Sequence, residues 1–318
     1  MGYDFRRIDA SQVNGLKELV HQIYGNKEPN SISLEEKFNT KSFGAEYIGY
    51  AAYDSDQKRM IANNEIPIAY YGVYPAVVKV ENSEVLCAQS GDTMTHPNHG
   101  GKGLFTTLAR MTYDLAKKEG VKFIFGFPNE NSLPGFKRKL DWEFPYKMQK
   151  FSHFIPTLPL GLLKRKMKLR INPLCFKLAN LFFDVVKPGE LFSNQVRRAY
   201  PHLIRDYRFW NYKSNHTLFV RLDGIGVFLK FDGDLSIGDI IGNPTVNQAK
   251  KILRRLYLLA FFLGANRVRS YFSPNSDLSK ILSSHGYISS SLYYGFINFN
   301  CEFSPADLGL TFVDYDTF

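Results

Sequence analysis

The sequence lacks several features that would place the chain in a special class of protein. It has three cysteines, an odd number without metal-ligand spacing (Cys87, Cys175 and Cys301). This favours reduced, buried thiols over a disulfide framework or a zinc site. The first ten residues carry charges and no apolar signal-peptide segment. No run of about 18 apolar residues occurs, so no transmembrane helix is expected. These absences predict a cytoplasmic globular protein without a metal.

Positive charge is in excess. The net charge of +10 predicts an anionic binding partner, which could be nucleic acid, a membrane surface or a polyphosphate ligand. The densest basic run covers residues 164–170, and no nucleic-acid-binding motif accompanies it. Two interpretations stay open for this run. It is either a solvated face of a linker helix or a positive rim for a nucleotide diphosphate or a membrane-associated assembly.

The glycine-rich stretch 95–105 is the most informative part of the chain. It follows an apolar run at 85–88 and precedes residues 106–119, where apolar side chains recur at helical spacing. The order strand, turn, helix predicts free N–H groups at a helix N-terminus, which favour a phosphate. A Walker A loop is excluded because Lys102 is followed by Gly103. A Rossmann fingerprint is excluded because no further glycine follows at the required spacing.

A second cluster lies downstream at the distance that a known family requires. It consists of a predicted strand at 121–127, an Asn-containing turn at 128–132 and a short helix at 134–140 that leads into Lys139-Leu140-Asp141-Trp142. Together the two clusters resemble the acyl-CoA site of the GNAT (GCN5-related) N-acyltransferases, with Gly103 in the place of the family's central glycine. The sequence departs from the family where Gly100 replaces Arg or Gln and where Phe105 replaces a small residue. The family's tyrosine acid is replaced by Phe136 or Lys137.

The resemblance implies an acyl-CoA co-substrate, either acetyl-CoA or a longer or hydroxylated short acyl-CoA, and no metal. It places the pyrophosphate on the loop and pantetheine along the edge of the preceding strand. The residues expected to contact the cofactor are Met94, Thr95, Gly100, Gly101, Lys102, Gly103, Leu104, Phe105, Thr106, Asn131 and Phe136.

The expected reaction is the attack of a neutral amine on a thioester carbonyl, so a base must remove a proton. Asp92 is the first candidate for that base, and its alternative role is to bind a neighbouring hydroxyl in the strand. Backbone N–H groups near Met94 are expected to stabilise the oxyanion. His96 and His99 flank the loop; His96, which precedes Pro97, is expected to be structural, and His99 is expected to contact solvent or phosphate. The carboxylate of Phe318 is a further candidate for the base, a role that a chain terminus has in some members of the family.

The predicted fold class is α/β with a mixed sheet, in a tandem GNAT arrangement. We predict an acyl-CoA-binding domain at 1–150, a helical basic linker at 151–200 and a degenerate GNAT-like domain at 201–318. The C-terminal half repeats the order β-β-β-α-β-α-β, but its junction at 241–245 has a single glycine and is a poor phosphate cradle. The degenerate domain is expected to form part of the acceptor pocket.

The tandem pattern narrows the resemblance to bacterial enzymes that acylate nucleotide-linked deoxyamino sugars of the dTDP type for surface polysaccharides. Residues 208–213 carry the Trp-containing motif of that branch, in which Arg208, Trp210 and Tyr212 are the expected substrate contacts, with packing between the domains as the alternative for the two aromatic residues. An acyltransferase for an aminoglycoside or a protein lysine is the second hypothesis. A non-catalytic acyl-CoA sensor or nucleic-acid-binding protein is the third. The expected partners are therefore small molecules, without nucleic acid, and a homodimer stays open.

Overall fold

The computed structural model describes residues 2–25, 34–157, 173–186, 198–213 and 217–316. The chain divides into two compact units. Unit 1 contains Met1–Tyr146 and Leu292–Asp307, and unit 2 contains Lys147–Ser291 and Leu308–Asp316. None of the described helices is long and apolar enough to cross a membrane.

Unit 1 is built on a mixed sheet with the strand order β1-β2-β5-β6-β7-β15. The strands β1 (Tyr3–Arg7), β2 (Ile48–Asp54), β5 (Ala69–Val80) and β6 (Ser83–Thr95) pair antiparallel with their neighbours. β6 then pairs parallel with β7 (Phe123–Gly126), which is antiparallel to β15 (Tyr287–Asn298). A small hairpin of β3 (Met60–Ile61) and β4 (Asn64–Glu65) stands apart from this sheet.

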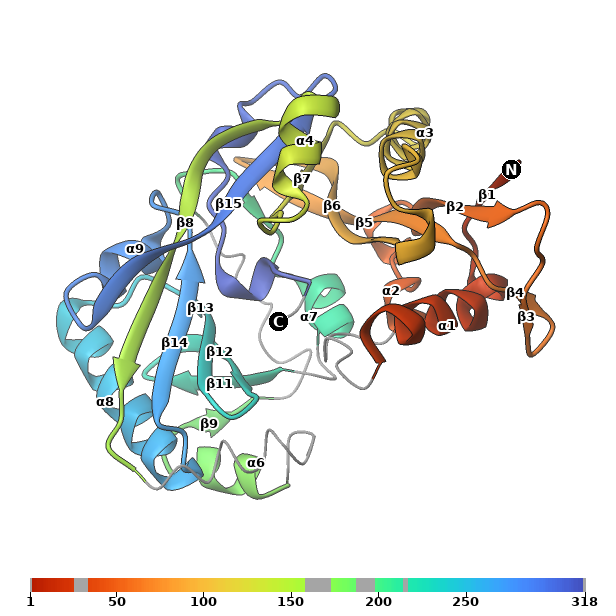
Figure 1. Cartoon of the computed structure of the whole chain (residues 1–318). Helices are drawn as coiled ribbons and strands as arrows, with labels where there is room; N and C mark the ends of the chain where they lie inside the picture. Colours follow the sequence, from red (N-terminus) through yellow and green to blue (C-terminus); the bar gives the residue numbers. More distant parts are fainter. Residues whose placement is uncertain (1, 26–33, 158–172, 187–197, 214–216, 317–318) are drawn as a thin grey trace. The chain divides into compact units, whose positions relative to one another are not determined.

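Helices cover both faces of the unit 1 sheet (Figure 1). α3 (Leu104–Lys118) and α4 (Leu133–Lys139) pack on one face, where Leu108, Phe136 and Trp142 share a core with β2, β5 and β7. α1 (Val13–Tyr24) and α2 (Leu34–Lys37) cover the other face, where Leu16 and Leu19 pack against tyrosines of β2 and β5. The central strands β2, β5 and β7 are therefore buried on both sides along most of their length, as their near-continuous apolar sequences require.

Unit 2 repeats this plan with the strand order β9-β11-β12-β13-β14-β8. β9 (Asp184–Val185), β11 (Leu218–Leu222), β12 (Ile225–Phe231) and β13 (Leu235–Ile241) form an antiparallel series, and β13 pairs parallel with β14 (Arg267–Phe272). α8 (Val246–Leu263), α6 (Pro173–Asn180) and α9 (Asp277–Leu282) pack on one face. α7 (Tyr207–Lys213) packs its Phe209 and Trp210 on the other face, against Phe228.

The two units exchange their last strands. β8 (Glu143–Phe154) follows α4 along the chain, yet from residue 149 it pairs antiparallel with β14 of unit 2. β15 follows α9, yet from residue 295 it pairs with β7 of unit 1. The compact units therefore have other bounds than the expected 1–150, 151–200 and 201–318, because Leu292–Asp307 returns to unit 1.

Most elements fall where the periodicity predicts them, and the differences have physical reasons. The sequence pattern 66–80 predicts two strand pieces bent near Gly72, whereas β5 is one strand whose register shifts between Tyr71 and Val73. The start of the expected helical linker is the second half of β8, a strand of alternating exposure. The apolar spacing over 178–185 predicts a packing stripe of Leu178, Leu181, Phe182 and Val185, which is confirmed for all of them except Leu181, whose side chain is exposed. The basic run 164–170 lies outside the described residues.

Candidate acyl-CoA site in unit 1

The site begins at a fork between two parallel strands. β6 and β7 pair at Ala88↔Ile124, Gln89↔Phe125 and Ser90↔Gly126, where β7 ends. β6 continues to Thr95 while still paired with β5 on its other side. The register therefore shows that the two strands separate after Ser90. Beyond Ser90, β6 presents an edge that β7 does not cover.

A shift of register beside the fork decides which backbone groups face that edge. The partners of β5 change from Ser90 (opposite Val73) to Thr93 (opposite Tyr71), so Gly91 and Asp92 together oppose one residue, as in a β-bulge. His96 donates its N–H to the carbonyl of Ile68 at 2.7 Å, which fixes the alternation of the ladder beyond the bulge. Met94 then faces β5, and the backbone groups of Thr93 and Thr95 face the open edge. Among the N–H groups near Met94, those of Thr93 and Thr95 are placed for a ligand.

The glycine loop leads from this edge into α3. Gly101 and Gly103 have φ angles of +75° and +79°, and a Cβ at either would meet no atom within 4 Å. A side chain would therefore fit sterically at both positions, and glycine is favoured because the backbone is in the left-handed region. Gly103 is the N-cap of α3, no described side chain caps that end, and no acidic residue stands in the first turn. The N-terminus of α3 therefore keeps N–H donors and a positive dipole end for an anion.

Two histidines precede the glycines. The side chain of His96 caps the short 3-10 turn Pro97–His99 by accepting from the N–H of Asn98 at 3.3 Å. Burial lowers the pKa of His99, and Lys102 lowers it further. A neutral His99 with Asp54 4.0 Å away gives no positive charge to a phosphate. Lys102 is then the cation of the loop at neutral pH.

Phe105 and Phe136 serve as packing in the described structure. The Phe105 ring lies 5.2 Å from that of Phe136 and covers Gly135, where a Cβ would come within 2.8 Å of the ring. Phe105 therefore takes the position of a small residue because Gly135 makes room for it in α4. Leu104 and Phe136 are both buried, and the N–H and carbonyl of Phe136 bond Ser132 and Trp142, so of these two residues only Leu104, at the N-terminus of α3, has a backbone N–H for a ligand. Asn131 is exposed in the turn before α4, and its N–H bonds the Asn129 side chain.

A buried network of hydrogen bonds, which no sequence pattern predicts, supports the fork. Ser90 Oγ lies 2.7 Å from the hydroxyl of Tyr71, which lies 3.2 Å from that of Tyr113. The indole of Trp142 donates to Tyr113 at 2.8 Å. Burial raises the pKa of Tyr71 and of Tyr113, so both stay protonated. These hydrogen bonds connect β5, β6 and α3 at Ser90, the residue after which β6 and β7 separate.

Asp92 lies on the opposite face, in an ion pair that the sequence did not reveal. Lys37 of α2 is buried and donates from Nζ to Asp92 Oδ1 at 2.8 Å and to the Tyr74 hydroxyl at 3.2 Å. The other carboxylate oxygen, Oδ2, is buried and has no hydrogen-bond partner among the described residues, and the same is true of the Tyr70 hydroxyl. The alternative role of Asp92, a bond to a neighbouring strand hydroxyl such as that of Ser90 or Thr93, is not found among the described residues. A buried acceptor atom without a partner costs free energy, so Oδ2 has room for a hydrogen-bond donor from a ligand or a water.

The corresponding places in unit 2 are closed. Thr245 and Gln248 form a capping box at the N-terminus of α8, so donors that α3 leaves open are satisfied by side chains. β13 and β14 also part after Ser236↔Arg269, but the segment 308–314 occupies the fork. Its Thr311 bridges to Phe272, and the N–H of Ser273 donates to the carbonyl of Leu310 at 2.8 Å.

Buried ion pairs hold that segment in place. Arg205 bonds Asp239 of β13 at 2.9 Å and Asp314 at 2.7 Å, and Arg198 bonds Asp239 at 2.8 Å. Lys213 is buried beside them and donates to the carbonyl of Tyr315 at 2.6 Å. Burial lowers the pKa of Lys213 to about 7 and that of His202 to about 4.

The low pKa of Lys213 predicts a pH-dependent stability. Unfolding restores the ordinary value of 10.5, so the unfolded chain binds more protons between about pH 7 and about pH 10 and stability rises over that range. Lys213→Met removes the buried charge and should flatten this rise, a change on the order of 3 kcal/mol. Thermal unfolding across this pH range measures it, with the exposed Lys251→Met as the control. A rise of the same steepness in Lys213→Met contradicts the assignment.

The expected substrate contacts of unit 2 divide into two kinds. Trp210 is buried and packs against Phe219 and Phe228, which favours the packing role. Arg208 is partly exposed and forms an ion pair with Asp206 at 2.6 Å, and Tyr212 is partly exposed. Phe318, the other candidate for the base, lies outside the described residues. No group of residues that could hold a metal occurs in the part of the chain that the structure describes.

Residues 4–144 match the model of the acetyltransferase (GNAT) domain. No curated protein matches the sequence.

Solved structures resemble the fold over nearly the whole chain. A GCN5-related N-acetyltransferase from Kribbella flavida has 12% identity and a TM-score of 0.52, covering 93% of this chain and 72% of its own. A second one, from Anabaena variabilis, has 13% identity and a TM-score of 0.51 with the same coverage. Saccharomyces cerevisiae N-myristoyltransferase with bound myristoyl-CoA has 9% identity and a TM-score of 0.56, covering 96% and 82%. The chain is thus a mixed α/β protein with the GNAT fold, consistent with a tandem arrangement.

Proposed function

We propose that the chain is an acyl-CoA-dependent N-acyltransferase in which unit 1 binds the acyl-CoA. The single observation that carries this proposal is the open fork of β6 and β7 beside an uncapped helix N-terminus. The edge of β6 has the form that a pantetheine amide chain can extend by β-augmentation. The loop ending at Gly103 can take the pyrophosphate on backbone N–H groups. The GNAT domain match over residues 4–144 supports the same assignment.

The reaction proposed for this site is direct transfer. The amine nitrogen attacks the thioester carbonyl, and the oxyanion is stabilised by the backbone N–H of Thr93 or Thr95. The C–S bond then breaks, an amide forms and the CoA thiolate leaves. Asp92 takes the amine proton through Oδ2, directly or through a water. Alignment of the two reactants supplies much of the acceleration.

The inferred role of unit 2 follows from its closed fork. A capped α8 and a fork filled by residues 308–314 argue against a second CoA site, so we propose that unit 2 is a degenerate copy. Its proposed task is to contribute to acceptor binding, with the partly exposed Arg208 and Tyr212 as contacts and Trp210 as packing support. The acceptor we propose is the amino group of a nucleotide-linked deoxyamino sugar of the dTDP type, for surface polysaccharide synthesis. This acceptor rests on the sequence resemblance around residues 208–213.

Mass-spectrometric detection of acyl transfer tests donor and acceptor together. The protein is incubated with pooled short acyl-CoAs and separate pools of nucleotide-linked amino sugars, aminoglycosides and lysine peptides. We expect an acylated product in the nucleotide-sugar pool and none without protein. A product in another pool keeps the transferase and replaces the acceptor. CoA binding without any product contradicts the transferase and favours the sensor.

A further inference from the structure

Five large apolar side chains are exposed at one end of unit 2, by between 46% and 73% of their surface. We call them the apolar patch: Phe154, Leu181, Leu258, Phe261 and Phe262. Its members are connected through their neighbours. The ring of Phe262 stacks on that of Phe182 at 5.8 Å, next to Leu181, and Thr157 Oγ1 donates to the carbonyl of Phe261 at 3.0 Å, three residues after Phe154.

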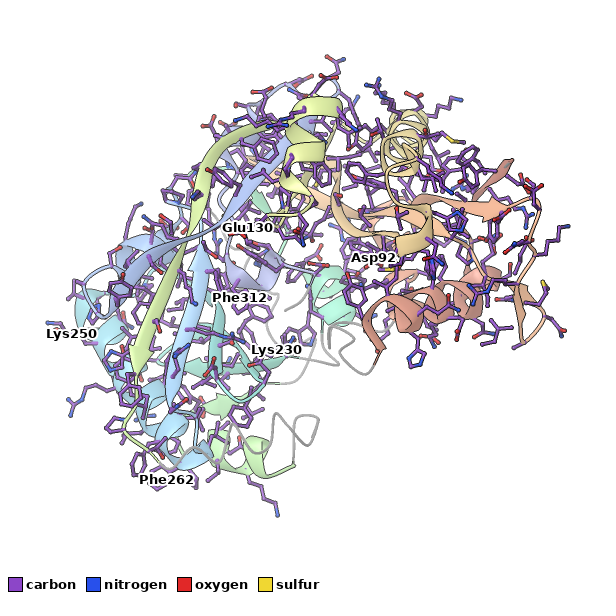
Figure 2. All side chains as sticks on the ribbon, in the orientation of Figure 1. Asp92, Glu130, Lys230, Lys250, Phe262 and Phe312 are labelled. Atoms are coloured by element: carbon purple, nitrogen blue, oxygen red, sulfur yellow. The ribbon has the colours of Figure 1, made fainter. Side chains whose placement is uncertain are left out.

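Basic side chains border the apolar patch on the same helix. Lys250, Arg254, Leu258 and Phe261 follow one another at spacings of four, four and three residues and are exposed, so they form one stripe along α8. Figure 2 shows Lys250 and Phe262 at well-separated places along α8. The helix has no acidic residue. The exposed stripe therefore changes from cationic to apolar toward its C-terminal end.

Further positive charge lies around the apolar patch. Arg267 is exposed opposite Phe154 in the β8–β14 ladder, and Lys177 is exposed on α6. A cluster of exposed aromatic side chains with a positive rim is the pattern of a surface that enters the interface of an anionic bilayer.

We propose that the apolar patch docks unit 2 on an anionic lipid surface. The phenylalanines enter the boundary between headgroups and acyl chains, while Lys250 and Arg254 meet the lipid phosphates. A second copy of the chain is a poorer occupant, because a symmetric contact through the same patch brings two positive rims together. The surface belongs to unit 2 alone and does not depend on the proposed transferase activity.

Flotation with lipid vesicles tests the docking surface on the full chain. The vesicles contain phosphatidylcholine alone or mixed equally with phosphatidylglycerol. We expect binding to the anionic vesicles, with a partition coefficient that falls at higher salt. Phe261→Gln/Phe262→Gln should lower it at least about tenfold, since two partly exposed rings no longer enter the lipid. Val246→Gln removes an exposed apolar side chain at the other end of α8 and is the matched control.

The other outcomes each overturn the proposal. Equal binding by wild type and Phe261→Gln/Phe262→Gln assigns the affinity to basic residues elsewhere. No binding to anionic vesicles, together with a dimer in analytical ultracentrifugation that the variant loses, assigns the patch to a second copy. If the protein neither binds the vesicles nor forms a dimer, another part of the same chain covers the apolar patch. A second pair, Leu181→Gln/Leu258→Gln, repeats the test at other patch residues, and circular dichroism checks that each variant is folded.

Discussion

Gly103→Val should lower the affinity for CoA at least about a hundredfold while the protein stays folded. Gly103 has φ +79° at the N-cap of α3, and a Cβ there meets no protein atom within 4 Å. The substitution therefore costs backbone strain on the order of 1–2 kcal/mol without a clash inside the protein. A branched side chain at the helix N-terminus instead fills the space where a pyrophosphate approaches the N–H groups. Isothermal titration with CoA measures the loss.

Gly120→Val separates the strain from the binding. Gly120 has φ +88° just after α3, and its Cβ also meets no atom within 4 Å. The two variants should therefore lose similar stability in thermal unfolding, and only Gly103→Val should lose affinity. If Gly103→Val and the wild type bind CoA with equal affinity, the pyrophosphate does not bind at this loop.

Local signals allowed most elements to be predicted, and long-range pairing set the rest. The capping box at Thr245 and Gly264 after the last turn mark both ends of α8, and both are signals that the local sequence contains. The exchange of β8 and β15 leaves no local signal, because a strand reads the same whichever sheet it joins. This is why the boundary expected at residue 150 falls within β8.

The candidate site was predictable in its backbone and less so in its side chains. Glycines at positive φ and the order strand, turn, helix locate the loop from sequence alone, since both are local properties. Lys37 lies 55 residues before Asp92, and no sequence pattern joins two such residues. The partners of Tyr71 lie on β6 and α3, and only the register of the sheet brings them together. Residues 308–314 fill the fork between β13 and β14 through contacts that are equally distant in sequence.

Asp92→Asn should lower the turnover by about 10²–10⁴ and leave CoA affinity unchanged. The carboxylate sits on β6 next to the bulge, with Oδ1 held by Lys37 and Oδ2 buried without a partner in the described structure. The amide cannot accept the amine proton, whereas the glycine loop proposed to hold the pyrophosphate is unchanged. Steady-state kinetics with the acceptor that the mass-spectrometric screen identifies measures the loss. Asp54→Asn, at a buried carboxylate that caps the turn after β2, is the control.

Asp92→Asn could also lower turnover by destabilising the protein, because it breaks the ion pair with Lys37, and a double variant tests this explanation. Asp92→Asn leaves the buried ammonium of Lys37 without its counter-charge, which costs about 3–5 kcal/mol when the charge stays buried. Lys37→Met combined with Asp92→Asn removes both charges and should restore the melting temperature. If Asp92 is the base, the double variant regains stability and remains as inactive as the single one. Recovery of turnover together with stability would make Asp92 a structural partner of Lys37 and transfer the role of the base to another group.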